Sequence, residues 1–414
     1  MPELISLRCF YYSKAKDPSV LRSLVAPPYD VISEEEKQEL KDKNPDNICH
    51  VILPETYEGA GLKLQEMIEN HTLISNKNRC ICIYGIEYIR PKTGEKITRY
   101  GFVGLLKLAE IFPSADGIVP HEMTFKKFTK DRLNIIEKTD ANFSPIFTIY
   151  DGNGSAINIF KKYVNKEPFL KTLDLEGFTH KIWMVSNEED IKEFQNIIKK
   201  HSVIIADGHH RYITCLRHSR NGGCKYIMAL FIDFNDPGLI IYTSHRQIHK
   251  LPVKNLEDFR NKVKSFFIID EDIKNLQNLR DLMKANKGKR VFGCYFKNKF
   301  IFLKLKKEIN IEEFVSGNHS KEWKHLSLPI LHDILLKNCL NIKQEDISFI
   351  KNEEKGLENV EKGIIDALFM VNPTSLEEIH KITQLGEIMP QKSTYFYPKP
   401  LSGLIIHRHT ERIE

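Results

Sequence analysis

The chain has 414 residues, of which 41% are hydrophobic and 28% are charged, a composition typical of folded globular proteins and not of disordered chains. Its net charge of +6 is small for this length and the basic residues are spread along the chain, which argues against nucleic acid as the main partner. The length exceeds what one hydrophobic core usually supports, so we expect two or three domains.

The first section, residues 1–95, is predicted to mix strands and helices. Ser33 followed by three glutamates has the form of an N-cap with an acidic first turn, so a helix is predicted to run to about Lys43. Strands are predicted at 48–53 and 79–89, with a helical stretch at 61–76 between them.

The second section, residues 96–250, alternates strands and helices. The main predicted elements are strands at 99–108 and 202–206, a helix at 188–200, and a pair of strands at 226–234 and 239–242. The third section, residues 251–414, alternates charged helices with strands. Such a succession favours an α/β or α+β fold.

The cysteines and the N-terminus indicate the compartment. The eight cysteines are scattered, and the closest pair, Cys80 and Cys82, lacks the spacing of a zinc motif. A chain of this size needs no disulfide bonds, so reduced thiols are the simplest interpretation. No signal peptide is evident, and no apolar run reaches the roughly 18 residues that span a membrane. We therefore expect a cytoplasmic protein without a membrane partner.

The most informative segment lies where the apolar strand at 202–206 breaks. Asp207 and Gly208 turn the chain into a helix that begins with His209, His210 and Arg211. The first N–H groups of a helix lack intrahelical partners and the positive end of its dipole lies there, so this turn can hold a phosphate group. Adjacent basic side chains at this end of a helix are unfavourable unless an anion binds. We predict a phosphate site made by Gly208, His209 and Arg211, with Arg211 as the bidentate contact.

A metal site is the alternative at the same segment. Adjacent histidines rarely reach one ion together, and catalytic zinc usually takes three protein ligands, so zinc is disfavoured. Asp207, ionised beside cations, is predicted to bind Mg²⁺ or to accept a hydroxyl proton. His210 is a further candidate catalytic residue.

A second constellation is Pro120-His121-Glu122. A loop that begins with proline and carries a histidine and a glutamate is placed to supply a general base, for which Glu122 is the candidate. Lys126 and Arg132 follow on a helix-like segment, and we expect these two residues and His121 to contact phosphate. The plain alternative is an ordinary polar helix start.

Two further segments carry candidate contacts. Lys392, Ser393 and Thr394 precede three aromatic residues, and together they could bind a nucleotide or a small polar substrate; a half-buried strand is the alternative. Arg246, after the strand at 239–242, is a candidate phosphate contact, although a solvated strand end explains it more simply.

The segment Asp207-Gly208-His209-His210-Arg211 resembles the phosphate-binding signature of the ParB/sulfiredoxin superfamily, in which a strand–loop–helix turn holds nucleotide phosphates. The form with two histidines is similar to the free-serine kinase branch. Those kinases phosphorylate the hydroxyl of L-serine with a nucleotide donor and magnesium, and an upstream glutamate acts in catalysis. The resemblance implies that Glu122 occupies that position.

Over nearly its full length the chain is also similar to a large, uncharacterised bacterial and archaeal family, whose members are often found beside serine-biosynthesis enzymes. The shared pieces are 27–33, 120–122, 142–147, 206–212 and 389–398. Asn142 and Ser144, in the third piece, are expected to contact substrate. The chain departs from the compact serine kinases in its long flanks, which could change the substrate.

The resemblance implies an α+β fold with a ParB/sulfiredoxin-like mixed-sheet core at 96–250, an N-terminal α/β region at 1–95 and a C-terminal α/β region at 251–414. It further implies a small-molecule kinase that uses Mg²⁺ and ATP or ADP to phosphorylate L-serine or a serine-like metabolite. Two alternatives stay open. One is a nucleotide-binding switch that acts on DNA or a partner protein, and the other is a noncatalytic sensor of a phosphorylated metabolite.

Overall fold

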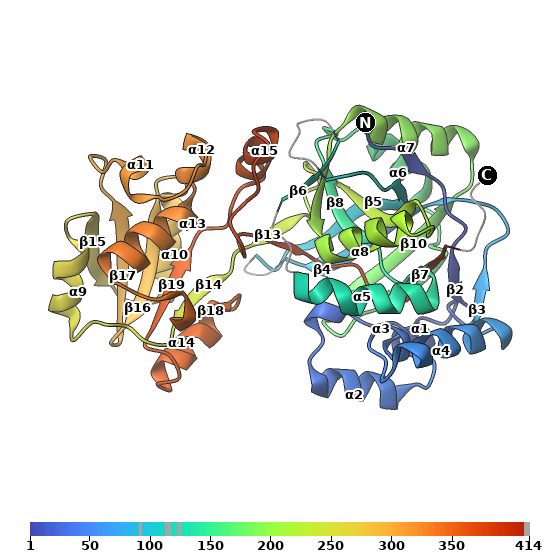
Figure 1. The fold of residues 1–414 in the computed structure, drawn as a ribbon, viewed down its shortest axis with the longest axis horizontal. Coiled ribbons are helices and arrows are strands. Elements are labelled where there is room, and N and C mark those ends of the chain that lie inside the picture. Colours follow the sequence, from blue (N-terminus) through green and yellow to red (C-terminus); the bar gives the residue numbers. More distant parts are fainter. Residues whose placement is uncertain (91–92, 112–116, 122–125, 410–414) are drawn as a thin grey trace. The chain divides into compact units, whose positions relative to one another are not determined.

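The computed structural model describes residues 1–90, 93–111, 117–121 and 126–409 (Figure 1). The chain forms two compact units: unit 1 comprises residues 1–240 and 396–414, and unit 2 comprises residues 241–395. The chain leaves unit 1 in β13 (Ile240–Tyr242) and returns to it in β20 (Tyr395–Tyr397). This division differs from the three sections expected from the sequence, because the first two sections contribute strands to one sheet and the C-terminal residues return to the same unit.

Unit 1 is built on a mixed sheet. Within the described residues this sheet has nine strands, in the order β6-β11-β8-β12-β5-β4-β10-β9, with β1 beside β5. The pairs β6–β11 and β8–β12 are parallel and the other pairs are antiparallel. The strands are β1 (Leu4–Ile5), β4 (Ile81–Ile89), β5 (Lys96–Lys107), β6 (Ile118–Pro120), β8 (Ile146–Tyr150), β9 (Leu170–Leu173), β10 (Thr179–Val185), β11 (Val203–Asp207) and β12 (Tyr226–Asp233).

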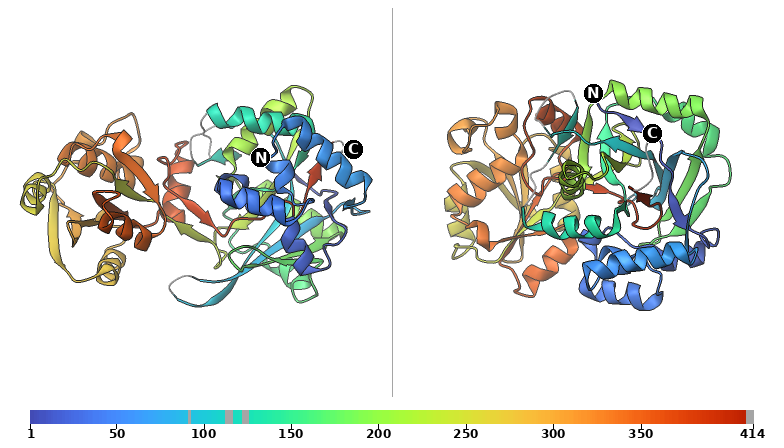
Figure 2. Two further views of the ribbon diagram at one scale, coloured as in Figure 1. Left: turned by 90° about the horizontal axis from the view of Figure 1, so that it is seen from below. Right: turned by 45° about the vertical axis from the view of Figure 1, so that its right-hand side comes forward.

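The two longest strands, β4 and β5, pair along their length and form a hairpin that extends from the sheet (Figure 2, left). Most of their residues are buried on both faces of the sheet. This burial explains why the sequence of β4 reads as a nearly continuous apolar run and not as an alternating one. Two small ladders complete unit 1: β2 (Phe10–Tyr12) with β3 (Leu73–Ser75), and β7 (Ala141–Asn142) with β21 (His407–Arg408).

Two groups of helices surround this sheet. The helices α5 (Lys126–Thr139), α6 (Ile157–Tyr163), α7 (Glu188–Lys200) and α8 (His209–Arg220) contribute side chains to one hydrophobic cluster with the strands. In this cluster the ring of Phe102 lies 4.4 Å from that of Phe194 on α7. The N-terminal helices α1 (Pro18–Leu24), α2 (Glu34–Lys43), α3 (Cys49–Ile52) and α4 (Tyr57–Glu69) form the second group, and α4 packs against α5 (Figure 1).

Local sequence signals explain several of these helices. The predicted helix after Ser33 is confirmed: the Ser33 side chain accepts a hydrogen bond from the Glu36 backbone and the Glu36 side chain accepts one from Ser33, which is a capping box. The predicted helix at 188–200 is confirmed as α7, which buries Phe194, Ile197 and Ile198. The predicted strand at 48–53 is wrong, since these residues form α3. A short apolar run that is buried on several sides does not distinguish a strand from a helix.

The predicted pairing of 226–234 with 239–242 is also wrong. Both edges of β12 are occupied, by β5 and by β8. The hydrophobic pattern of a strand fixes which face is buried but not which strand lies beside it.

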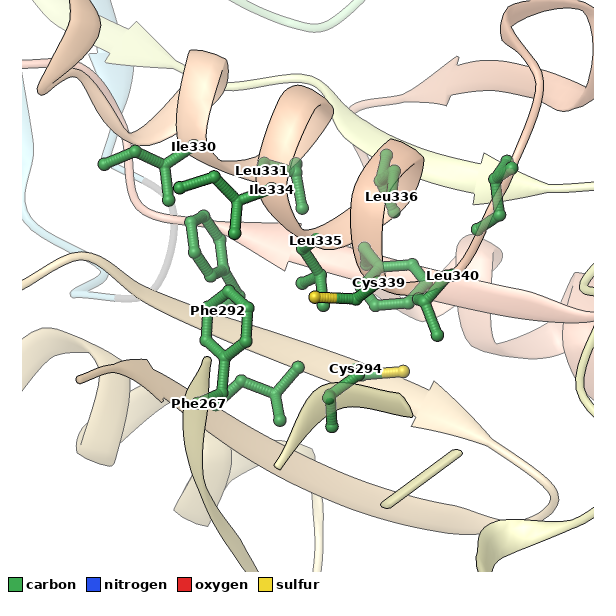
Figure 3. Packing of buried hydrophobic residues seen from close by; sticks show 14 of the residues in the cluster. Phe267, Phe292, Cys294, Ile330, Leu331, Ile334, Leu335, Leu336, Cys339 and Leu340 are labelled. Atoms are coloured by element: carbon green, nitrogen blue, oxygen red, sulfur yellow. The ribbon is translucent and has the colours of Figure 1, made fainter. Parts of the chain in front are cut away.

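Unit 2 is an antiparallel sheet covered on both faces. Its strand order within the described residues is β15-β17-β16-β19-β14-β18. A π-helix, η2 (Ile330–Cys339), packs on one face against Phe267, Phe292 and Cys294 (Figure 3). The other face packs against α10 (Leu276–Ala285). The strands are β14 (His245–Ile248), β15 (Phe267–Ile273), β16 (Val291–Phe296), β17 (Lys299–Leu305), β18 (Ile347–Ile350) and β19 (Ala367–Val371).

The remaining helices of unit 2 are α9 (Leu256–Val263), α11 (Ile311–Phe314), α12 (Lys321–Lys324), α13 (Ser327–Pro329), α14 (Glu353–Glu361) and α15 (Leu376–Gln384). The combination of mixed and antiparallel sheets with separate helices confirms the predicted α+β class. None of the described helices combines the length and the apolar character that crossing a bilayer requires.

Candidate functional site

The turn from β11 into α8 forms as the sequence predicts. The register between β11 and β8 shifts between Ile205 and Asp207, and such a bulge re-aims the side chain that follows it. Gly208 has φ 90° and ψ 25°, a left-handed conformation that side chains disfavour. A Cβ atom at this position would also lie 2.8 Å from Cγ2 of Ile146. Both the conformation and the space therefore require glycine.

Asp207 lies between two cationic side chains. The Nζ of Lys399 donates to Oδ1 of Asp207 at 2.6 Å, and Nη2 of Arg211 donates to Oδ2 at 3.1 Å. Burial by itself would raise the pKa of Asp207, but the charges of Lys399 and Arg211 outweigh it and hold this pKa below its usual range. Asp207 is therefore ionised at neutral pH.

Lys399 is a site residue that the sequence analysis missed. Its side chain is only 8% exposed, and its Nζ also lies 3.4 Å from Oδ2 of Asp30. The available signal was indirect: Asp30 lies within the shared piece 27–33, and Lys399 directly follows the shared piece 389–398.

Arg211 connects the helix start to the segment before β8. Its Nη1 donates to Oγ of Ser144 at 2.8 Å and to the carbonyl oxygen of Pro145 at 2.9 Å. Its Nε is buried and has no hydrogen-bond partner in the part of the chain that the structure describes. The predicted Arg211 and Ser144 are thus brought together, and one donor of Arg211 is left for a ligand.

The start of α8 remains open to a ligand. Gly208 has no side chain that could cap the helix, and no side-chain cap is formed there within the described residues, so the first N–H groups can donate to a ligand. His209 is buried, and this burial lowers its pKa well below the usual value. The ring of His121, 4.9 Å away, lowers the pKa of His209 further. His209 is therefore a neutral hydrogen-bonding group, which corrects its predicted cationic character. His121 is fixed in turn, since its Nδ1 donates to the Ile205 carbonyl at 2.6 Å.

A cavity of about 60 Å³ lies beside Arg211. Its apolar lining includes side chains of α3, α5 and β8, and its polar lining consists of Tyr29, Arg132, Asn142, Ser144, Arg211, Thr214 and Ser402. A water molecule needs roughly 10–15 Å³ measured in this way, so the cavity has room for a small metabolite or a few waters.

Two of the cavity residues are held in place by their own contacts. The guanidinium of Arg132 stacks 4.1 Å from the ring centre of Tyr29, and its Nη1 donates to the Ile52 carbonyl at 2.9 Å. The side-chain oxygen of Asn142 accepts from the Met228 backbone at 3.1 Å. Arg132 and Asn142, both predicted from the sequence, therefore face the same cavity as Arg211.

The other predicted residues lie elsewhere. Glu122 and the side chain of Lys126 are outside the described part of the structure. Arg246 belongs to unit 2, where it is fully buried and donates to His332 at 3.0 Å, which argues against a phosphate contact.

The segment Lys392-Ser393-Thr394 also belongs to unit 2. Ser393 is buried there, and its carbonyl accepts from Oγ1 of Thr374 at 3.3 Å. The site described above is formed by residues of unit 1.

Comparison with curated proteins finds no match. Among solved structures, a free serine kinase in complex with AMP is 17% identical, with 72% of this chain and 92% of that chain covered and a TM-score of 0.35. A conserved hypothetical protein from Pyrococcus furiosus is 17% identical, with 71% and 94% covered and a TM-score of 0.32. SbnI with a C-terminal truncation, from Staphylococcus aureus, is 13% identical, with 71% and 82% covered and a TM-score of 0.32. Likenesses at this level do not identify an activity.

A match to a sequence family is more extensive. The profile of the family described as "Protein of unknown function (DUF1015)" matches residues 5–328. This range contains the shared pieces 27–33, 120–122, 142–147 and 206–212 that the sequence analysis singled out. The protein therefore belongs to the DUF1015 family, which confirms the expected membership of an uncharacterised family.

Proposed function

We propose that this protein is a nucleotide-dependent small-molecule kinase, with donor phosphates bound at the start of α8 and an acceptor hydroxyl compound bound in the adjacent cavity. The observation that carries the proposal is the position of Arg211. Arg211 lies in the first turn of α8, and it also lines the cavity together with Arg132. One cation thus lies between the place for a phosphate and the place for a small polar acceptor.

The phosphate side of the site combines three kinds of donor. The open N–H groups of α8 and the neutral ring of His209 supply hydrogen bonds, and Arg211 and Lys399 supply positive charge. Asp207 carries one negative charge between these two cations. Asp30, whose side chain is 42% exposed, lies 3.4 Å from Lys399 and offsets the second cation, so the helix dipole and the first N–H groups of α8 would favour a phosphate here in addition to the two cations. Fixed cations of this kind stabilise charge as it moves during phosphoryl transfer.

Asp207 does not fit the predicted role of a magnesium ligand. Its two carboxylate oxygens already accept hydrogen bonds from Lys399 and Arg211, whereas Mg²⁺ requires free oxygen ligands. Its lowered pKa also makes it a weak base. We assign Asp207 as a positioning residue that holds the two cations in place.

The acceptor side favours a small hydroxy acid. Arg132 and Arg211 line a cavity that also contains the amide of Asn142, and guanidinium groups bind carboxylates well. Because Arg132 is already paired with Asp131, Arg211 is the main candidate for the substrate carboxylate. L-serine has a carboxylate, a hydroxyl and a size that suit this cavity. In the transfer step, the serine oxygen forms a bond to the terminal phosphorus and the bond from that phosphorus to the nucleotide breaks. The hydroxyl proton passes to a general base, for which Glu122 remains the prediction and His210 the alternative.

Incubation of the full chain with Mg²⁺, L-serine and either ATP or ADP tests this proposal. We expect phosphoserine by mass spectrometry together with consumption of the nucleotide. Arg211→Ala should weaken nucleotide binding and reduce product. Arg220→Ala serves as the control, because Arg220 lies on the same helix and pairs with the exposed Glu110.

Two results would contradict the proposal. If nucleotide is bound but neither consumed nor transferred to L-serine or related hydroxy acids, the protein is a switch or a sensor. If Arg211→Ala leaves nucleotide affinity unchanged, the phosphate site has been placed wrongly.

A further inference from the structure

We propose that unit 1 carries a second site, at the opposite end of α8, that binds a divalent transition-metal ion of the Zn²⁺ class through Asp140, His218 and His409. These three side chains each offer one ligand atom, and the three atoms lie within 4.8 Å of one another. His218 follows His209 by nine residues along α8, which places the two ends about 14 Å apart along the helix axis. The metal site is therefore independent of the proposed phosphate site.

The three ligands come from distant parts of the sequence and are fixed by the backbone. Asp140 lies between α5 and β7 with φ 46°, a left-handed conformation uncommon outside glycine, and its N–H donates to the Ile136 carbonyl at 2.8 Å. His409 follows β21, and its N–H donates to the Asp140 carbonyl at 2.8 Å. Backbone strain of this kind persists where surrounding structure holds it, often at ligand sites.

The third ligand, His218, is fixed by packing. A Cβ atom on Gly223 would lie 2.1 Å from Cδ2 of His218, so only glycine at 223 leaves room for this ring orientation. The N–H of Gly223 also donates to the His218 carbonyl at 3.0 Å. The turn after α8 therefore sets where Nε2 of His218 lies.

The two distances from Asp140 to the histidine nitrogens fit tetrahedral coordination of a metal ion. Oδ1 of Asp140 lies 3.4 Å from Nε2 of His218 and 3.2 Å from Nδ1 of His409. Bonds of 2.0–2.1 Å to Zn²⁺ give a tetrahedral edge of about 3.3 Å, which lies between these two values. The third edge joins Nε2 of His218 to Nδ1 of His409, which lie within 4.8 Å of each other.

Two buried histidine side chains lie side by side at the C-terminal part of the site. The side chain of His409 is 2% exposed, and its Nε2 has no hydrogen-bond partner among the described residues. The neighbouring ring of His407, 5.5 Å away, is also buried, and neither of its nitrogens has a partner within the same part of the chain. Because Nδ1 of His409 faces Asp140, the unpaired Nε2 lies on the far side of the same ring, and the metal site is argued from the geometry of the three ligand atoms.

The ligand set selects the ion. Two imidazole nitrogens and one carboxylate suit Zn²⁺ and similar transition-metal ions, whereas Mg²⁺ and Ca²⁺ prefer oxygen ligands. The Asp140 side chain is 36% exposed, so an ion can enter from solvent and water can fill the fourth position. A bound ion would join the turn after α5, the end of α8 and the C-terminal segment.

Titration of the full, metal-free chain with Co²⁺ and Zn²⁺ tests this site. We expect a Co²⁺ absorption spectrum of nitrogen and oxygen ligands without thiolate charge-transfer bands. The spectrum distinguishes this site from a second candidate cluster among the described residues, the buried thiols of Cys9, Cys80 and Cys82. Zn²⁺ should displace Co²⁺ and raise the melting temperature.

Substitutions complete the test. His218→Ala and Asp140→Asn should each weaken metal binding by at least about 10–100-fold. A loss of this size is typical even when the substituted residue only hydrogen-bonds to a metal ligand. The exposed His249, in unit 2, provides a control, since His249→Ala should leave binding unchanged. Circular dichroism of each variant separates loss of a ligand from loss of folding.

Three outcomes would overturn the site. In the first, the wild-type chain would fail to bind Zn²⁺ or Co²⁺. In the second, the Co²⁺ spectrum would show thiolate charge transfer that Cys82→Ser removes. In the third, a folded His218→Ala variant would bind the metal ion as tightly as the wild type. In each of these cases Asp140 and its two histidines are only a hydrogen-bonded group.

Discussion

Replacing Gly208 by alanine probes the turn on which the proposed phosphate site depends. Gly208 has φ 90°, and an added Cβ would lie 2.8 Å from Ile146 and 2.9 Å from Nη2 of Arg211. The left-handed conformation costs an alanine about 1–2 kcal/mol, and overpacking of a buried position typically costs a further 1–3 kcal/mol or so. We therefore expect Gly208→Ala to lower the free energy of unfolding by about 2–5 kcal/mol, the sum of these two terms.

Gly222 offers a matched control. It also has φ 90°, but a Cβ at this position meets no atom within 4 Å. Gly222→Ala should therefore cost only the backbone contribution of about 1–2 kcal/mol. The difference between the two variants isolates the contact with Ile146 and Arg211.

Urea denaturation followed by circular dichroism measures both variants, and nucleotide titration measures the site. We expect Gly208→Ala to be less stable than Gly222→Ala and to bind nucleotide more weakly, because the added methyl group displaces the Arg211 guanidinium. Equal destabilisation of the two variants, with unchanged nucleotide affinity in both, would refute the role assigned to Gly208.

Three further predictions concern charge, pH and thiol chemistry. A double-mutant cycle with Asp207→Asn and Lys399→Met should give a coupling free energy of about 1.5–3 kcal/mol, as for a hydrogen bond between charged groups, and a coupling near zero would contradict the pairing. Because burial lowers the pKa of His209, the unfolded chain binds more protons below about pH 6.5, so stability falls with decreasing pH by at most about 1.4 kcal/mol per pH unit. Between pH 7.5 and 5.5, the urea midpoint should decrease less in His209→Gln than in the wild type. An equal decrease in both proteins would argue against a neutral, buried His209. Seven of the eight cysteines are buried and Cys224 is partly exposed, so a thiol reagent should label Cys224 rapidly in the native chain and the others only after unfolding; fast labelling of several thiols would disagree with the packing.

Local sequence signals were sufficient where neighbouring residues decide the structure. A buried strand, a glycine and a helix start at 203–209 are consecutive along the chain, so their order already predicts a turn with open N–H groups. The capping box at Ser33 and Glu36 is equally local. Arg211 could be named because it lies at the helix start and Arg132 because it follows the segment 120–122, whereas Asn142 and Ser144 were candidates through the family resemblance.

Long-range contacts could not be read from the sequence. Lys399 reaches Asp207 from 192 residues away, and no period or motif links the two positions. The strand at 48–53 was predicted wrongly because its burial arises from neighbours distant in sequence. The neutral state of His209 likewise depends on burial and on the ring of His121 from another segment.

The sequence by itself determined that a strand, a glycine turn and a helix start follow one another at Asp207, the local arrangement on which the proposed phosphate site depends, because the chemistry of a helix start depends on adjacent residues. Only the tertiary structure decided which cations meet there, that Asp207 holds Lys399 and Arg211, and that Arg211 also lines a cavity with Arg132. It also brought Asp140, His218 and His409 together. The physical reason is the same throughout: local propensities fix helices and turns, whereas charge pairing, burial and ligand geometry arise between residues that only the folded chain places side by side.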